Sequence, residues 1–218
     1  MKEAHFIHAD TEVRTDLIRG CIADSNYDGR KFLVEEDEPD YELKMSYDFL
    51  FGYMRVKNGI AGGIMPRRIC EIGVSSGISA MAFLDACPKA YYLGIDNRFE
   101  EEMRGVSLVD HAIELLKPYN AQVLITDSQK LTELPEGNFD LVHVDGDHSR
   151  EACCHDVVLA WNALSADGWI LVDDAKDSAV CAGTFDAIRK VWPAEIRWAY
   201  LEDTFTGNIL IRKELPKP

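Results

Sequence analysis

The sequence predicts an α/β fold: a doubly wound, mostly parallel, seven-stranded sheet with a C-terminal antiparallel hairpin and an N-terminal helical cap. From residue 68 onward, short apolar runs alternate with segments whose apolar residues recur every three or four positions. This alternation is typical of βα units, which place their strands in a parallel sheet. The last two apolar runs flank a turn-rich segment, EDTFTG, and therefore indicate a β-hairpin.

The strands and helices follow from these runs in chain order. Strands are expected at Arg68–Gly73, Tyr91–Asp96, Ala121–Thr126, Phe139–Asp145 and Trp169–Asp173, and the hairpin at Ile196–Leu201 and Asn208–Arg212. Helices are expected at Gly77–Ala86, at Glu101–Lys117, after Ser149 and at Val180–Trp192. Asp167 and Gly168 are expected to turn the chain into the fifth strand, whose unbroken apolar run suits a strand buried on both faces.

Before residue 68 the pattern changes. Residues 1–60 are expected to form a helical cap or lid, and residues 61–218 the ligand-binding domain, within one globular unit. The stretch 35–42, EEDEPDYE, indicates an acidic exposed linker. One helix is predicted by the apolar stripe at Leu43, Tyr47, Leu50, Phe51 and Met54. This cap is expected over the carboxyl edge of the sheet, where open α/β folds bind ligands.

Composition and charge exclude several classes. A formal net charge of -15 argues against a nucleic-acid partner, because such binding depends on Lys and Arg that neutralise phosphates. No apolar stretch approaches the ~20 residues that cross a bilayer, and the first residues lack the apolar core of a signal peptide, so we expect a cytoplasmic protein. The six cysteines have no CxxC spacing and indicate neither a disulfide framework nor a zinc site.

The turn after the first strand, EIGVSSGIS at residues 71–79, is a candidate nucleotide site. Gly73 lets the chain leave the strand sharply, Gly77 permits close approach of a ligand, and the next helix offers free N–H groups. Ser75 and Ser76 occupy the middle, so this is not the GxGxxG of dinucleotide enzymes. A βα turn that needs glycine only for its geometry is the alternative.

Two further strand ends favour a nucleoside. Asp96 ends the second strand, where a carboxylate can accept hydrogen bonds from both hydroxyls of a ribose, and Asp127 lies at the adjacent strand end. As a lone residue, Asp96 would more often cap a helix. The three strand ends together make a nucleoside site the better interpretation.

The run HVDGDHS, residues 143–149, is followed after the next strand by Asp173 and Asp174. Three aspartates, Asp145, Asp173 and Asp174, at neighbouring strand ends suit Mg²⁺, which prefers hard oxygen ligands. Asp145, Asp147 and His148 could instead cap the helix that begins near Ser149, and the Asp173–Asp174 pair could cap the next helix. We expect His143 to point into the sheet as a core histidine whose ring nitrogens are hydrogen-bonded.

In this order and spacing, EIGVSSGISA, YYLGIDNR, ITDSQKL, FDLVHVDGDHSRE and GWILVDDA resemble the motifs of class I S-adenosylmethionine-dependent methyltransferases, which have a Rossmann-like fold. HVDGDHS with the later DD resembles the divalent-metal-dependent O-methyltransferases of the catechol and macrolide-sugar types. The resemblance covers roughly residues 68 to 175 well and the remainder in outline.

The resemblance implies a role for each motif residue. Glu71, Gly73, Ser75 and Gly77 would line the methionine part of S-adenosylmethionine, Asp96 would bind its ribose, and Asp127, Ser128 and Gln129 would meet its adenine, with Asp145 also beside the cofactor. Asp145, Asp173 and Asp174 would ligate Mg²⁺ or another divalent cation. The catalytic base would be His148, as in some sugar-modifying relatives, or Asp147, as in others.

The primary hypothesis is a magnesium-dependent O-methyltransferase that acts on a hydroxyl of a small molecule, of sugar or phenolic type. One alternative is methylation of an amine or carboxylate without metal, and another is a cofactor-binding protein without catalysis. A nicotinamide dehydrogenase is disfavoured by the absence of GxGxxG. The short tail after Asp174 fits an open site or one completed by a second subunit of a homo-oligomer.

Overall fold

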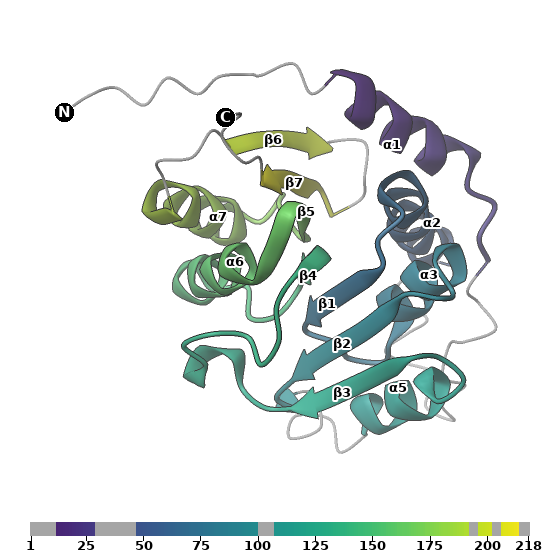
Figure 1. Ribbon diagram of the computed structural model, residues 1–218, viewed down its shortest axis with the longest axis horizontal. Coiled ribbons are helices and arrows are strands. Elements are labelled where there is room, and N and C mark those ends of the chain that lie inside the picture. The colour runs from purple at the N-terminus through teal and green to yellow at the C-terminus, as the bar shows by residue number, and fades with distance from the viewer. Residues whose placement is uncertain (1–11, 29–46, 100–106, 192–195, 202–205, 214–218) are drawn as a thin grey trace.

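A computed structural model gives the architecture of the chain and describes residues 12–28, 47–99, 107–191, 196–201 and 206–213. Seven strands form one sheet in the order β3-β2-β1-β4-β5-β7-β6 (Figure 1). The strands are β1 Arg68–Ile72, β2 Tyr91–Asp96, β3 Ala121–Ile125, β4 Phe139–Val144, β5 Leu164–Val172, β6 Ile196–Leu201 and β7 Asn208–Lys213. The helices are α1 Glu12–Asp24, α2 Tyr47–Ile64, α3 Ile78–Ala86, α5 Leu108–Leu116, α6 Arg150–Ala163 and α7 Ser178–Val191.

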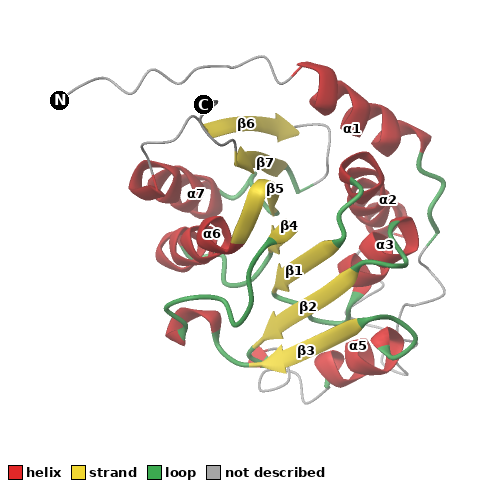
Figure 2. Ribbon diagram, in the orientation of Figure 1, coloured by secondary structure: helices red, strands yellow, loops and turns green. Residues whose placement is uncertain are grey.

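Helices cover both faces of the sheet (Figure 2). Because side chains alternate along a strand, Ile69 of β1 and Leu141 of β4 pack with Ile60 of α2 and Phe83 of α3 in one core. The residue after Leu141, Val142, belongs to the opposite core, which α6 and α7 cover. The predicted doubly wound fold is thus confirmed.

Strands β1 to β5 pair in parallel, whereas β7 pairs antiparallel with both β5 and β6. This confirms the predicted parallel sheet with its C-terminal hairpin. The five predicted strands and the hairpin differ from the observed ones by a few residues at their ends, with one exception. The predicted turn at Asp167–Gly168 is wrong, because β5 already begins at Leu164 and the pair lies within it, at a register shift against β4.

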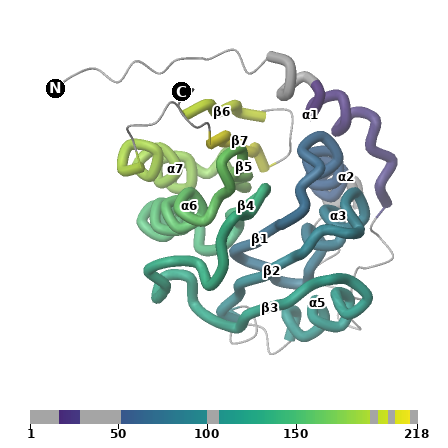
Figure 3. Tube along the Cα trace, viewed as in Figure 1, coloured from purple at the N-terminus to yellow at the C-terminus, as the bar shows by residue number. Residues whose placement is uncertain are grey.

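The third βα repeat lacks an α-helix. After β3 the chain forms only a 3-10 turn, η3 at Ser128–Lys130, and then crosses from the edge of the sheet to β4 in its middle (Figure 3). Pro135 and Gly137 stand in this connection, and both residue types disfavour a helix interior.

The amino-terminal region places α2 beside the sheet and α1 against α2. The two helices approach closely at Gly59, where an added Cβ would lie 2.4 Å from the Cα of Ile22. Helix α2 continues past residue 60, where the sequence suggested the end of the cap. Met54, one residue of the predicted apolar stripe, is buried. Leu43, the linker 35–42 and the first part of the helix expected from Glu101 lie outside the described residues. Among the described helices, none combines the length and apolarity needed to cross a membrane.

Candidate active site

The glycine turn after β1 is held against the loop after β4. Gly73 has φ 89° and donates its N–H to the carbonyl of Ile95, 2.9 Å away. A Cβ at this position would lie 2.0 Å from the backbone oxygen of Asp145. Gly77 also has positive φ, 82°, and an added Cβ would lie 2.9 Å from the Cβ of Ala112. Both positions therefore require glycine, for backbone conformation and for close approach.

Asp96 organises this turn. Its Oδ2 accepts the N–H groups of Val74 and Ser75, at 2.9 and 3.0 Å, and its Oδ1 accepts the N–H of Arg98 at 2.7 Å. Ser75 is in the left-handed region, with φ 46°. A carboxylate offers about four acceptor sites, so Asp96 can hold the turn and still accept a further hydrogen bond from a ligand.

The loop after β3 lies at the neighbouring strand end. Asp127 begins η3, where its side chain accepts the N–H of Gln129 at 3.0 Å, and it pairs with Lys130 at 3.3 Å. Ser128 is half-buried and Gln129 is exposed. Three predicted cofactor contacts, Asp96, Asp127 and Ser128, thus follow two adjacent strands.

Glu71 is completely buried. Its carboxylate accepts hydrogen bonds from the hydroxyls of Ser79 and Tyr92, and its Oε1 lies 2.7 Å from Nδ1 of His143 on the neighbouring strand. Glu71 has no exposed surface. These contacts tie β1 to β2, to β4 and to the start of α3 beneath the glycine turn.

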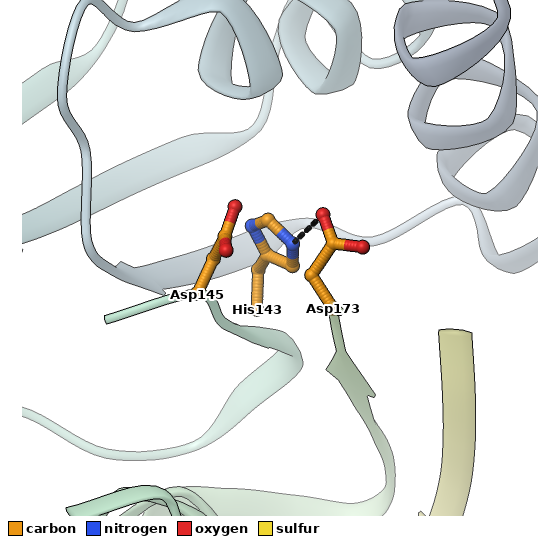
Figure 4. Close-up of side chains that lie close together, drawn as sticks. All are labelled: His143, Asp145 and Asp173. Carbon is orange, nitrogen blue, oxygen red and sulfur yellow. Dashed lines mark ion pairs between the residues drawn. The ribbon is translucent and has the colours of Figure 1, made fainter. Parts of the chain in front are cut away.

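His143 is a core residue, as expected, but only one of its ring nitrogens is hydrogen-bonded. Figure 4 shows it between Asp145 and Asp173. Its Nε2 is buried without a hydrogen-bond partner among the described residues and lies 3.9 Å from Oδ2 of Asp173.

Asp145 joins the cap to the sheet. Its Oδ2 accepts a hydrogen bond from the hydroxyl of Tyr53 in α2, at 2.8 Å, and its Oδ1 lies 3.7 Å from Nε2 of His148. Burial acts to raise the pKa of Asp145, but His148 and the positive charge of Lys57 outweigh it, so the pKa is held below its usual value. Asp145 is ionised at neutral pH.

Asp173 has an internal counterion. The ammonium of Lys57, which is fully buried, lies 2.6 Å from Oδ2 of Asp173 and 2.7 Å from Oδ1 of Asn208. The other oxygen of Asp173 accepts the hydroxyl of Thr206 at 2.6 Å and the N–H of Asp174 at 2.8 Å. Asp173 is 2% exposed and both of its oxygens accept hydrogen bonds, so it is less open to a cation than Asp145 and Asp174, although it lies with His143 and Asp145 in a second group that could hold a metal ion.

Asp174 and His148 meet at the surface of the site. Oδ2 of Asp174 lies 3.2 Å from Nε2 of His148, whose side chain is 48% exposed. Asp174 has φ 49°, a conformation that is uncommon without glycine and that often marks functional sites. Burial, with the charges of Asp145 and Asp173, raises the pKa of Asp174 to about 6. Contact with Asp145, then the charge of Asp174, raises the pKa of His148 to about 9 against the opposing effect of burial.

Asp147 lies in a different environment from Asp145 and Asp174. It is exposed, and its Oδ1 accepts the N–H of Ser149 at 2.7 Å, immediately before α6. The hydroxyl of Ser149 in turn accepts the N–H of Ala152 at the start of this helix. Asp147 therefore forms the turn that precedes α6, whereas His148 faces the carboxylates of Asp145 and Asp174.

The structure thus brings together Asp145, His148 and Asp174, whose ligand atoms lie within 4.8 Å of one another. It adds Tyr53 and Lys57, two residues that sequence reasoning missed. They stand four positions apart in α2, on one helix face. A lysine on an otherwise apolar helix face is the signal that could have indicated a buried charge partner.

Residues 70–175 match a family model described as a methyltransferase domain. No curated protein matches the sequence.

Several solved structures share the fold. The S-adenosylhomocysteine-bound methyltransferase PaMTH1 of Podospora anserina has 17% identity and a TM-score of 0.59, over 94% of this chain and 88% of its own. The O-methyltransferase TomG of Streptomyces achromogenes, in complex with S-adenosylmethionine, has 15% identity and a TM-score of 0.59, over 85% and 93%. An O-methyltransferase of Bacillus cereus, in complex with S-adenosylhomocysteine, has 12% identity and a TM-score of 0.55, over 94% of both chains.

Proposed function

We propose that this chain is a class I S-adenosylmethionine-dependent methyltransferase that methylates a hydroxyl group of a small-molecule acceptor, of sugar or phenolic type. The match of residues 70–175 to a methyltransferase domain and the shared fold support this proposal. The observation that carries this proposal is the contact between the glycine turn and the acidic site. Gly73 lies against the backbone of Asp145, which leads into the Asp145–His148–Asp174 cluster. A methyl donor in the turn would therefore lie beside groups suited to activating an oxygen nucleophile.

The chain's own residues supply the proton transfer. Methyl transfer is a displacement at the sulfonium-bound carbon, so the acceptor oxygen must lose its proton and align with that carbon. We assign the base to His148, because its Nε2 faces Asp145 and Asp174 while Asp147 holds the turn before α6. Asp145 and Asp174 orient the imidazole.

A divalent cation is part of the proposal, with a ligand set smaller than the sequence suggested. Asp145 and Asp174 fit it, because both are ionisable, partly exposed carboxylates in one cluster. We leave Asp173 out of this set, because it is buried and Lys57 already neutralises its charge. Mg²⁺ bound there would supply positive charge to a developing alkoxide.

A positive charge at the Asp145–His148–Asp174 cluster would also change the protonation of His148. Two carboxylates keep its pKa near 9, so the imidazole holds its proton at neutral pH. A cation that neutralises these two carboxylates would lower the pKa of His148 and favour the neutral imidazole, which can accept the proton of the acceptor hydroxyl.

Metal-free methyl transfer to an amine or carboxylate is the second candidate. The Lys57–Asp173 pair favours it, because one of the three expected ligands already has a buried positive partner.

Transfer of a labelled methyl group from S-adenosylmethionine tests the proposal. Purified, chelator-treated protein is given phenolic and sugar hydroxyl acceptors, with and without Mg²⁺. We expect label in a hydroxyl acceptor, Mg²⁺ stimulation, and loss of that stimulation in Asp174→Asn. Asp177→Asn, an exposed aspartate three positions later, is the matched control. Label only in amine or carboxylate acceptors, unaffected by chelation, would support the second candidate.

A further inference from the structure

A buried carboxylate in α6 has no role in the reaction described above. Asp156 has no exposed surface, and its Oδ1 accepts a hydrogen bond from Nε2 of Gln129 at 2.8 Å. Its Oδ2 is buried without a hydrogen-bond partner among the described residues. That oxygen lies beside Gly146, where an added Cβ would be 3.2 Å from it. A buried carboxylate with an unpaired oxygen is costly to the fold and suggests a function.

Asp156 determines which way the Gln129 amide points. The amide nitrogen also lies 3.4 Å from the carbonyl of Ala152 and 3.2 Å from the hydroxyl of Ser128. A carboxylate and a carbonyl can only accept hydrogen bonds, so the NH₂ must face α6 and the amide oxygen must face away. The hydrogen bonds of the Gln129 side chain within the described part of the chain all run through its nitrogen, and Gln129 is exposed.

This amide lies at the carboxyl edge of the sheet, where a nucleoside would extend from Asp96. Asp96 pairs in register with Ile125 of β3, and Gln129 follows four residues later. The loop after β4, with Gly146, flanks Asp156 on its other side. Ligands of open α/β sheets bind in this crevice.

We propose that Asp156 is a positioning residue that fixes Gln129 with its side-chain oxygen toward the cofactor's base, so that the site selects a 6-aminopurine. The inference rests on the cofactor of the proposed function. The exocyclic amine of adenine donates a hydrogen bond and suits an amide oxygen. The 6-oxo group of hypoxanthine can only accept a hydrogen bond. It would therefore face the amide oxygen of Gln129, a second acceptor, with no hydrogen between them.

The charge on Asp156 supports the same orientation. Burial raises the pKa of Asp156 to about 6, against the opposing effects of the Ser128 side chain, the charge of His155 and the hydrogen bond from Gln129. The carboxyl is therefore largely ionised at pH 7.5, where a carboxylate accepts from the amide NH₂ and cannot donate to its oxygen.

Calorimetric titration with two ligands tests the inference. S-adenosylhomocysteine carries adenine, and S-inosylhomocysteine carries hypoxanthine on an otherwise identical skeleton. At pH 7.5 we expect the wild type to bind the inosyl compound at least ~10-fold more weakly, the effect of one unmatched polar pair. In Asp156→Ala the amide can rotate, and the ratio of the two dissociation constants should fall to within about threefold. Asp156→Asn keeps an oxygen for the Gln129 NH₂ and should restore the ratio.

Two exposed glutamines provide a second route that does not disturb the core. Gln129→Met should abolish the discrimination, while Gln122→Met, on the exposed side of β3, should leave it intact. The inference is overturned if the wild type binds both ligands equally, or if folded Asp156→Ala keeps the wild-type ratio. Binding of S-adenosylhomocysteine without discrimination refutes this inference alone, whereas absence of binding by the folded wild type refutes the cofactor assignment and the inference with it.

Discussion

Aspartates stand at the carboxyl ends of four of the five parallel strands of this sheet, and each has a different environment. Asp96 and Asp127 accept backbone N–H groups, Asp145 accepts the hydroxyl of Tyr53, and Asp173 pairs with Lys57. In the sequence all four follow apolar runs and look alike. Their roles are set by residues distant in the chain, so at the residue scale the sequence predicts the position of these carboxylates better than their partners.

Asp96→Ala should weaken binding of S-adenosylhomocysteine at least ~10-fold, because the variant loses a charged acceptor for the ribose and for two N–H groups of the glycine turn. Titration calorimetry measures the change. Asp167→Ala, an aspartate whose side chain is 77% exposed, is the control. An unchanged dissociation constant in folded Asp96→Ala would exclude the ribose assignment.

His148→Gln should lower kcat by roughly 10²-fold or more, the usual contribution of a general base. Asp147→Asn should stay within about threefold of wild type, because an asparagine oxygen can still accept the N–H of Ser149. Initial rates at saturating acceptor compare the two. If Asp147→Asn is the more damaging, the base assignment moves to Asp147.

At the element scale, the strands follow directly from the sequence because apolar runs bounded by Gly, Pro and Asp have few alternatives. The connection between β3 and β4 and the early start of β5 do not, because they depend on pairing across the sheet. The position of α2 also depends on tertiary packing. The apolar stripe predicts a helix there, but only packing shows that Tyr53 and Lys57 reach the carboxyl ends of β4 and β5.

Lys57→Met should destabilise the fold by about 3–5 kcal/mol, because it leaves Asp173 buried without its charge partner. Denaturant unfolding measures the loss. Lys117→Met, which removes an exposed pair with Glu114, should change stability by less than about 1 kcal/mol. The double variant Lys57→Met with Asp173→Asn should recover part of the loss. A small effect of Lys57→Met alone would show that the pair does not anchor α2.

At the scale of the whole molecule, Asp156 makes stability depend on pH. Its folded pKa, about 6, exceeds the usual aspartate pKa of 3.8. The folded state therefore binds the proton more tightly, and this contribution is full below about pH 4 and lost as pH rises through about 6. Asp156→Asn removes the dependence, so its stability relative to wild type should rise by about 2 kcal/mol between pH 4.5 and pH 8. Urea unfolding at both pH values measures this, and a constant difference would contradict it.

The central claim is that the carboxyl edge of this sheet binds the methyl donor beside the Asp145–His148–Asp174 cluster. The most direct test is calorimetric titration of chelator-treated wild-type protein with S-adenosylhomocysteine, with NAD as the control ligand. The account predicts saturable binding of one S-adenosylhomocysteine per chain and none of NAD. Absence of S-adenosylhomocysteine binding by the folded protein, or preference for NAD, would contradict it.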